Sequence, residues 1–339
     1  MDVSLTAQCL PESDYDAWDA FVIASSHGSI YNTTAYLAAL CEAAGGTFRI
    51  LAAGKGDGLV GGVALYERRS GSDVRVAPRS LLFYNGIVLR DFAGKYPSQR
   101  TARTLEASAA LEAGVSAYGY KLVALRSVPA FTDTRSFSAR GWTVRPGYTY
   151  VVPIGNLELA WERVEQNLRR LVKRCSQQGF QFTEDDDFDS FLRMHVAMTA
   201  RKGLPLYLPE QEFKRFFRRL REQDLCRLYQ ARLPSGQAIS AQLVLTGKHR
   251  ISHSVCAAAD PDYLNTGATA FLRWKAFEAL STSGYSANDL TDAALNPVTH
   301  FKSQLGGNLE MCLICEKLQT PRKWHQRLKS KVAAFVAHR

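Results

Sequence analysis

Two segments of this chain repeat one pattern, and this repetition constrains the fold more than any other feature of the sequence. Residues 49–53 and 59–66 are largely apolar runs around a glycine-rich turn, and residues 227–231 and 238–245 flank a second turn at residues 234–236. Such runs on either side of turn-forming residues are typical of β-hairpins. Because helical patterns precede both hairpins, we predict an internal duplication.

The segments that follow the first hairpin complete the predicted architecture. Residues 105–119 favour an alanine-rich helix, residues 121–125 a strand, and residues 142–153, rich in valine and tyrosine, another strand. Alternating strands and helices with antiparallel hairpins predict an α/β (α+β) fold, with a mixed, mostly antiparallel sheet flanked by helices in each half. The predicted parts are an N-terminal domain at residues 1–154, a C-terminal domain at residues 155–320 and a basic tail or helix at residues 321–339.

Most of the candidate chemistry lies between residues 260 and 307. Turn-forming residues precede Asn265-Thr266-Gly267-Ala268, where we expect a helix to begin, and Gly284 ends that helix. The N-terminus of a helix carries unpaired N–H groups and a partial positive charge, so this position suits a phosphate or pyrophosphate. Asp289 then ends a short predicted strand, and Lys302 lies on a short amphipathic turn.

The motifs of this stretch resemble those of a known family. They are Gly267, Phe271-Leu272, Trp274-Lys275-Ala276, Gly284, Asp289-Leu290, Phe301-Lys302 and Leu305-Gly306, with Arg170, Lys173, Arg174 and residues 201–205 upstream. Together they resemble the second half of the Fem-type acyltransferases, which are tandem members of the GNAT superfamily. The resemblance covers the last half of the chain well and the first half faintly. It implies two tandem GNAT-like domains.

The resemblance also implies an acyl-transfer site. It places Phe301 and Lys302 where a tetrahedral oxyanion develops, and a cation there would stabilise that charge. Asp289 could orient the attacking amine or act as a base, although strand-end aspartates also cap turns and a lysine beside a core phenylalanine can be a surface residue. Asp292 stands where the family usually has glycine. The implied donor-binding residues are Leu243, whose strand would lend backbone N–H groups, and Asn265, Thr266, Gly267 and Ala268.

Basic residues on two predicted helices are candidates for binding an anionic substrate. Arg170, Lys173 and Arg174 lie on adjoining faces of a predicted helix over residues 160–179, and Arg201 and Lys202 end another helix. Either set could contact phosphates of a cofactor, a lipid-linked sugar or RNA. A solvated basic face and a favourable interaction with the helix dipole remain the alternatives.

Composition sets wider limits. With 42 Lys and Arg against 32 Asp and Glu, the net charge of +10 favours anionic partners such as a nucleotide cofactor, RNA or an acidic membrane surface. No secretory signal or membrane-spanning run is evident, so we expect a cytoplasmic protein, with contact to the inner face of the membrane left open. Seven cysteines without an export signal predict free thiols, and Cys312 and Cys315 should face opposite sides of a strand.

No metal site is expected, since His249 and His253 lack ligand spacing and the Cys312–Cys315 pair has no second pair to complete a zinc site. We predict an acyltransferase, most consistent with N-acyl transfer from acyl-CoA to an amine or hydroxyl of a small molecule or a cell-envelope or polysaccharide precursor. One alternative is a Fem-type enzyme that uses aminoacyl-tRNA on a peptidoglycan precursor. The other is a non-catalytic protein that binds an anionic glycan. DNA is not an expected partner.

Overall fold

The first half of the protein ends with a long strand at Pro153. The computed structural model describes residues 5–55, 58–295 and 297–318. The elements of the first half are β1 (Ala7–Cys9), η1 (Glu12–Asp14), α1 (Tyr15–Ala24), η2 (Ile30–Asn32), α2 (Thr34–Ala44), β2 (Thr47–Lys55), β3 (Gly58–Ser70), β4 (Asp73–Val76), β5 (Val88–Leu89), α3 (Pro97–Ala117), β6 (Leu122–Arg126), α4 (Arg135–Ser138) and β7 (Thr143–Pro153).

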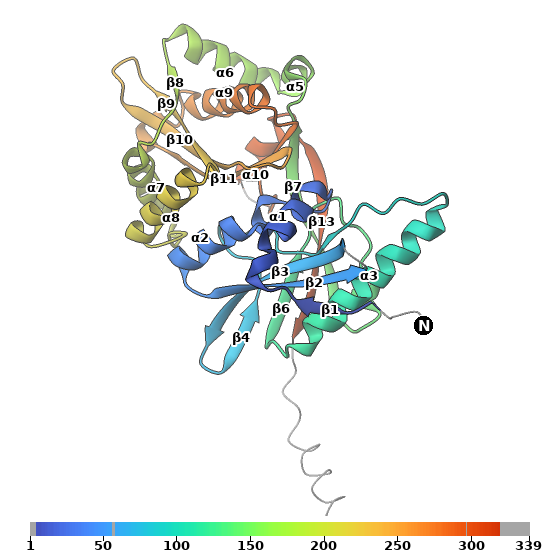
Figure 1. Ribbon diagram of the computed structural model, residues 1–339. Coiled ribbons are helices and arrows are strands. Elements are labelled where there is room, and N and C mark those ends of the chain that lie inside the picture. Colours follow the sequence, from blue (N-terminus) through green and yellow to red (C-terminus); the bar gives the residue numbers. More distant parts are fainter. Residues whose placement is uncertain (1–4, 56–57, 296, 319–339) are drawn as a thin grey trace, which may run out of the picture.

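The second half repeats this succession of strands and helices (Figure 1). Its elements are α5 (Leu157–Arg163), α6 (Gln166–Gln177), β8 (Gln181–Glu184), α7 (Phe188–Lys202), α8 (Glu210–Glu222), β9 (Cys226–Arg232), β10 (Ala238–Leu245), β11 (Ile251–Ala259), η3 (Pro261–Tyr263), α9 (Ala268–Thr282), β12 (Ala287–Asp289), α10 (Pro297–Ser303) and β13 (Asn308–Leu318).

Strand pairing is the same in the two halves. Strands β1, β2, β3 and β4 pair antiparallel in that order, and β4 pairs parallel with β6. Strands β8, β9, β10 and β11 also pair antiparallel, and β11 pairs parallel with β12. The two predicted hairpins are β2–β3 and β9–β10, at equivalent places in this pattern. The predicted duplication is therefore confirmed.

The last strand of each half is exchanged. β7 pairs with β12 of the second half, β13 pairs with β6 of the first, and β7 and β13 pair antiparallel with each other. Figure 1 shows these two strands between the two groups of elements. The predicted boundary at residues 154 and 155 lies directly after β7. Because each half completes its sheet with the other's last strand, the two predicted sheets form one continuous sheet.

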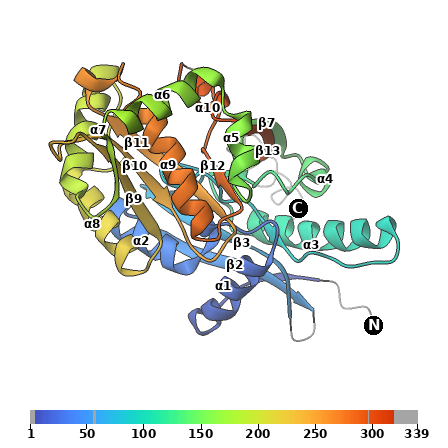
Figure 2. The same cartoon turned by 90° about the horizontal axis from the view of Figure 1, so that it is seen from above.

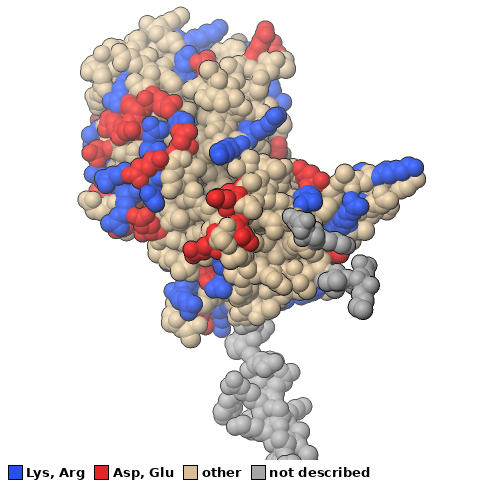
Figure 3. All heavy atoms as spheres, viewed as in Figure 1, with Lys and Arg blue, Asp and Glu red and all other residues tan. Residues whose placement is uncertain are grey.

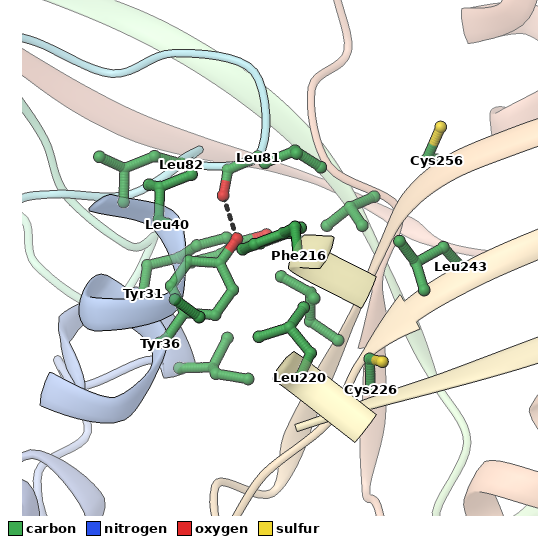
Figure 4. Packing of buried hydrophobic residues seen from close by; sticks show 14 of the residues in the cluster. Tyr31, Tyr36, Leu40, Leu81, Leu82, Phe216, Leu220, Cys226, Leu243 and Cys256 are labelled. Carbon is green, nitrogen blue, oxygen red and sulfur yellow. Dashed lines mark hydrogen bonds between the residues drawn. The ribbon is translucent and has the colours of Figure 1, made fainter. Parts of the chain in front are cut away.

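A hydrophobic cluster also joins the halves (Figure 4). Tyr31 and Tyr36 from the first half pack in the same cluster as Phe216 and Leu220 of α8, and the ring centroids of Tyr36 and Phe216 lie 5.9 Å apart. The Tyr36 hydroxyl donates to the carbonyl of Leu81. Burying this apolar surface stabilises the folded state only when both halves are in place.

Helices cover both faces of the second half (Figure 2). α6 and α9 share a hydrophobic cluster with Tyr229 and Ile239, whereas α7 and α8 share another with Leu228 and Leu243. Neighbouring residues of one strand thus point to opposite layers. The same rule separates Cys312 and Cys315, which lie in different clusters as predicted, and all seven cysteines are free.

The predicted helix over residues 160–179 is two helices. Val164 and Glu165 have extended ψ angles of 133° and 141° and separate α5 from α6. The Glu165 amide donates to the carbonyl of Gln304 instead of continuing the helix. A contact with a segment 139 residues away in sequence therefore decides this break, and helical periodicity could not reveal it.

The excess of basic residues forms no single basic face in the view of Figure 3, where Lys and Arg mix with Asp and Glu over α7 and α8. Residues 319–339, which include the predicted basic tail, carry six Lys or Arg and no Asp or Glu, and they lie outside the described residues. Among the described helices, none has the length and apolarity needed to cross a bilayer.

Candidate active site

Strand register brings four side-chain positions into one row across the sheet. His253 of β11 lies opposite Asp289 of β12, Asp289 lies opposite Val151 of β7, and Val151 lies opposite Asn308 of β13. Residues that pair across strands point to the same face of a sheet. This face therefore carries His253 and Asp289 next to each other, although the two residues are far apart in sequence.

Asp289 is a buried carboxylate, 2% exposed, with several donors around it. Tyr84 donates its hydroxyl to Oδ2 at 2.7 Å, Thr149 donates its hydroxyl to Oδ1, and the Thr291 amide donates to Oδ1 at 2.7 Å. Burial acts to raise the pKa of Asp289, but His253, Thr149 and Tyr84 together hold that pKa below its ordinary value. Asp289 is therefore an anion in a fixed orientation at neutral pH.

His253 is the neighbour that could exchange protons with a substrate. Its ring is 3% exposed, and Nδ1 lies 3.5 Å from Oδ2 of Asp289, within ion-pair distance but without the geometry of a hydrogen bond. The rings of Tyr31 and Tyr84 pack around it, with centroids 5.0 and 5.9 Å away. A histidine beside a fixed carboxylate has the arrangement of a general base and its orienting group.

His253 and Asp289 both line a cavity of about 710 Å³ between the two halves. Its walls come from the end of α1 and the loop after it (residues 23–29), from Tyr84 and Asp91, from residues 128–130, from the β10–β11 turn (residues 248–250) and from Glu310 on β13. Pockets of this size bind small molecules or parts of larger ones. Both halves build the cavity, so no single predicted domain contains it.

Lys302 lies just beyond this row, on α10. Its ammonium donates to the backbone carbonyls of Thr291 and, at 2.7 Å, Asp292. Both of these residues have positive φ angles, 47° and 58°, which are uncommon without glycine. The glycine expected at position 292 therefore has a structural reason here. Phe301 is half-buried and packs against the second hydrophobic cluster, which anchors α10.

Burial lowers the pKa of Lys302 to about 8, and the nearby cation Arg273 acts in the same direction. Arg273 itself is 7% exposed, and its Nε and Nη1 atoms have no hydrogen-bond partner in the described part of the chain. Burial lowers the pKa of Arg273 to about 10, so it stays charged at neutral pH. An uncompensated buried cation is costly, which favours a bound anion or carbonyl oxygen near α9 and α10.

The space for such a ligand is the gap where β11 and β12 diverge. Their parallel pairing stops at His253 and Asp289, but β11 continues from Ser254 to Ala259 with no strand on that side among the described residues. Leu243 pairs with Cys256 and Val244 pairs with Ser254, so Val255 is an extra residue in β11. Such a bulge leaves backbone groups unpaired.

Leu243, the predicted source of backbone N–H groups, lies one strand away from this gap. β10 is paired on both sides and the Leu243 side chain is buried in the core, so the ladder already uses much of its backbone. Sequence alone does not show which strand borders the gap. The bulged strand β11 is the better source of free N–H groups.

The predicted helix after Asn265-Thr266-Gly267-Ala268 is α9, which begins at Ala268. Gly267 is its N-cap, with a φ of +94° that favours glycine, and the cap lacks a side-chain hydrogen bond. Arg174 of α6 donates to the carbonyl of Thr266 at 2.7 Å, which fixes this loop. The Ala268 N–H donates to the Thr266 hydroxyl, and the next N–H groups in the first turn of α9 have no acceptor within the helix.

The other predicted basic residues do not meet in one place. Arg170 and Lys173 are exposed on α6, on the α9 side of the sheet, whereas Arg201 and Lys202 are exposed at the end of α7, on the opposite side. None of them lines the cavity. Within the described residues, no group of three or more His, Cys, Asp or Glu side chains is arranged to hold a metal ion.

Sequence reasoning misses three residues of this site: His253, Tyr84 and Glu310. Two-residue periodicity places His253 on one face of β11, but only the pairing with β12 shows that Asp289 is its neighbour. Tyr84 comes from a long loop of the other half, and nothing local in the sequence marks its contact with Asp289.

Comparisons with known proteins agree with this fold. A family model described as an acetyltransferase (GNAT) domain matches residues 162–303. FemX is 13% identical, with a TM-score of 0.69, over 91% of this chain and 96% of that chain. The L-PGS of Bacillus licheniformis is 12% identical, with a TM-score of 0.57, over 95% of this chain and 96% of that one.

A tandem GNAT protein from the clavulanic acid biosynthesis pathway is 10% identical, with a TM-score of 0.53, over 94% of this chain and 100% of that chain. At these identities the structural likeness speaks for the fold, and no curated protein sequence gives a significant match. Residues 162–303 therefore match the family model of a GNAT acetyltransferase domain, and the whole chain has the fold of FemX and of a tandem GNAT protein.

Proposed function

We propose that this protein transfers an acyl group from acyl-CoA to an amine or hydroxyl of an acceptor bound in the 710 Å³ cavity. The observation that carries the proposal is the position of His253 and Asp289. They line the cavity, and they are also the last pair before β11 and β12 diverge. A donor in the gap and an acceptor in the cavity would meet at this pair.

The donor would lie along the unpaired edge of β11, with its pyrophosphate at the first turn of α9. The residues support this arrangement, because the cap at Gly267 lacks a side-chain hydrogen bond and Arg273 is a buried cation whose Nε and Nη1 atoms have no partner among the described residues. Acyl-CoA is the donor that a GNAT domain favours. The bulge at Val255 would supply backbone N–H groups to the thioester carbonyl.

In the proposed reaction the acceptor attacks the thioester carbonyl directly. His253 takes a proton from the attacking group, and Asp289 orients the imidazole and stabilises its charged form. The bond from the acceptor to carbon forms, the carbon–sulfur bond breaks, and the thiol leaves with a proton. Lys302 uses two of its three N–H groups on the carbonyls of Thr291 and Asp292, so one remains for the oxyanion.

Aminoacyl-tRNA is a second candidate donor, and one contact favours it. Arg174 joins α6 to the loop before α9, so the exposed Arg170 and Lys173 lie on the helix that borders the donor end of the gap. Exposed cations there would suit an RNA backbone. The fold shared with FemX and with L-PGS points to an acceptor from the cell envelope in either case.

Calorimetry and a turnover assay test the proposal together. CoA and deacylated tRNA are titrated separately into the protein, and thiol release from acetyl-CoA is followed in the presence of candidate amines. We expect CoA to bind, and Asp289→Asn to keep that binding while lowering transfer by a factor of roughly 10²–10⁴, as for loss of an acid–base group. Binding of tRNA without CoA would favour the second donor, and binding without any transfer would leave a non-catalytic protein.

A further inference from the structure

Arg273 is a buried cation whose charge no described residue balances. Its side chain on α9 is 7% exposed, and it forms no ion pair or hydrogen bond in the described part of the chain. The group that favours its charged form is the thiol of Cys256 on β11, but burial raises the pKa of that thiol and keeps it neutral. Because an unpaired buried guanidinium destabilises the fold, its presence points to a ligand that supplies the missing negative charge.

The position of Arg273 on α9 directs it to the gap between β11 and β12. α9 lies over this part of the sheet (Figure 2). Thr269 stands one turn before Arg273 on the same face of the helix, and its hydroxyl lies 3.5 Å from the hydroxyl of Ser240 on β10. The face that carries Arg273 therefore covers the sheet. Arg273 also lowers the pKa of Lys302 on α10 and acts on Cys256 in the unpaired part of β11, so it lies near both at the gap.

The sheet on the α9 side of the gap has small side chains and a second unsatisfied polar atom. Gln242 pairs with Ala257 and Ser240 pairs with Ala259, so these residues face the same side as α9. Both alanines are half-buried, and each fills only the space of a methyl group. The Oε1 atom of Gln242 is buried without a hydrogen-bond partner among the described residues. Such atoms are uncommon in folded proteins, which is an independent sign that a ligand occupies this side.

The depth of Arg273 in the fold separates it from the proposed pyrophosphate position. Arg273 is the sixth residue of α9, about 7–8 Å along the helix axis from Ala268, where the helix begins. Its neighbour at the gap is Lys302, which we propose contacts the thioester oxygen. The missing anion therefore belongs to the reacting end of the donor. A carboxylate fits best, since its two oxygens match the planar fork of a guanidinium.

We propose that Arg273 selects a donor whose acyl group ends in a carboxylate, such as succinyl-CoA, by pairing with that carboxylate in the gap. This inference rests on the proposed acyl transfer and names the class of acyl group. The acceptor still attacks the thioester carbon, the carbon–sulfur bond breaks, and the thiol leaves with a proton. The distal carboxylate takes no part in these steps, and it passes to the product with its charge. An acetyl or butyryl group would leave Arg273 unpaired.

Calorimetry with three forms of CoA tests this inference. Succinyl-CoA and butyryl-CoA, whose acyl chains have the same length, and free CoA are titrated into the wild type, Arg273→Met and the control Lys275→Met. Lys275 is on the same helix but pairs with Glu278 at the surface between α6 and α9, so its change removes the same charge away from the gap. We expect the wild type and Lys275→Met to bind succinyl-CoA about 10–100-fold more tightly than butyryl-CoA, as for a hydrogen-bonded charge pair. Arg273→Met should lose this preference and bind free CoA as the wild type does.

Thermal melting shows whether Arg273 has a structural role instead. Methionine keeps the length of the side chain and removes an unpaired buried charge, so Arg273→Met should be at least as stable as the wild type. A much lower melting temperature would make Arg273 a structural residue and overturn the inference.

Three binding results would also overturn it. They are equal affinity of the wild type for succinyl-CoA and butyryl-CoA, a preference for succinyl-CoA that persists in Arg273→Met, and an Arg273→Met variant that binds all three forms more weakly by one factor. The last result would assign the guanidinium to the pyrophosphate. In each case free CoA still binds the wild type, so the proposed function stands, whereas binding of none of the three forms would overturn both proposals.

Discussion

The two halves of this protein share one strand pattern but treat the gap between their parallel strands in opposite ways. In the second half β11 and β12 diverge, and beyond His253 the edge of β11 has no strand partner among the described residues. In the first half the corresponding place beside β4 and β6 is filled by the chain itself. β5 pairs with β3. The backbone N–H of Asn85 donates to the carbonyl of Arg126, and the side-chain oxygen of Asn85 accepts from the backbone N–H of Arg126.

Equivalent positions carry different residues. Strand β7 of the first half is equivalent to strand β13 of the second. When the two strands are exchanged, the pair Val151–Asn308 at one end of their ladder corresponds to the pair Glu316–Thr143 at the other end. Asp289 lies opposite Val151, and Ala124 lies opposite Glu316, so Ala124 takes the place of Asp289 in the first half. Lys302 lies six residues before the start of β13, and Phe137 lies six residues before the start of β7. Phe137 is therefore the counterpart of Lys302 in the first half.

Phe137 is buried and packs edge-on against Trp142, with ring centroids 5.1 Å apart. The first half thus has core residues where the second has a carboxylate and an ammonium. It serves the site in another way, through Tyr84 and the walls of the cavity. The difference teaches that duplication of a scaffold does not duplicate its chemistry, and it predicts one site for each chain.

Among the variants that test the difference between the two halves, the largest effect is expected from Lys302→Ala. If its ammonium stabilises an oxyanion that exists only in the transition state, turnover should fall by a factor of roughly 10²–10³ with donor and acceptor binding nearly intact. Lys214→Ala, a change of a half-buried lysine on α8 that pairs with Asp189, should have no effect on turnover. Full turnover in Lys302→Ala, or loss of folding around the Thr291–Asp292 turn alone, would make Lys302 a structural residue.

The same variant series has a pH signature. Lys302 must be protonated to donate, and its lowered pKa of about 8 means that the protonated fraction declines as the pH rises above that value. Turnover should therefore decrease on the alkaline side of pH 8. Lys302→Arg, whose guanidinium stays charged, should move this decrease to higher pH without restoring the full rate, because a planar fork places its charge differently. If turnover decreases over the same pH range in Lys302→Arg as in the wild type, the decrease arises from a group other than Lys302.

Asn85→Ala tests the closed gap of the first half. Its amide nitrogen donates to the carbonyl of Ala124 at 2.9 Å and its amide oxygen accepts from Arg126 at 2.9 Å, so the variant leaves two largely buried backbone groups unpaired. We expect a loss of about 1–3 kcal/mol in the free energy of unfolding, measured with urea. CoA should still bind once per chain. A second binding site in this variant would contradict the view that the first half has lost its donor chemistry.

The smallest effect is expected at the helix N-termini. Asn265→Asp adds a carboxylate beside the first turn of α9, where we propose the pyrophosphate, and Ser98→Asp adds one at the first turn of α3. The former should weaken CoA binding by about 2–5-fold and the latter should not, with the difference shrinking at high salt. Gly267 is a poor choice for this test, since its φ and its contact with Leu171 would strain any side chain. If the two changes weaken CoA binding equally, the proposed position of the pyrophosphate at the first turn of α9 is wrong.

Local patterns in the sequence were enough to predict much of this molecule. Apolar alternation and turn residues located both hairpins, and with them the duplication. The cap at Gly267, the strand with Cys312 and Cys315 on opposite faces, and the positions of Asp289 and Lys302 at element ends also follow from short-range rules. These features depend on residues within a few positions of each other, which is the range over which sequence patterns carry information.

Tertiary structure alone decided the exchange of β7 and β13, the pairing of His253 with Asp289 and the arrival of Tyr84 from the other half. It also decided that Glu310 shares a wall with Asp289 and that Asn85 closes the first gap. Each of these contacts joins segments tens to hundreds of residues apart. Their formation depends on strand register and on burial of a shared core, and neither quantity is encoded in any one stretch of the chain.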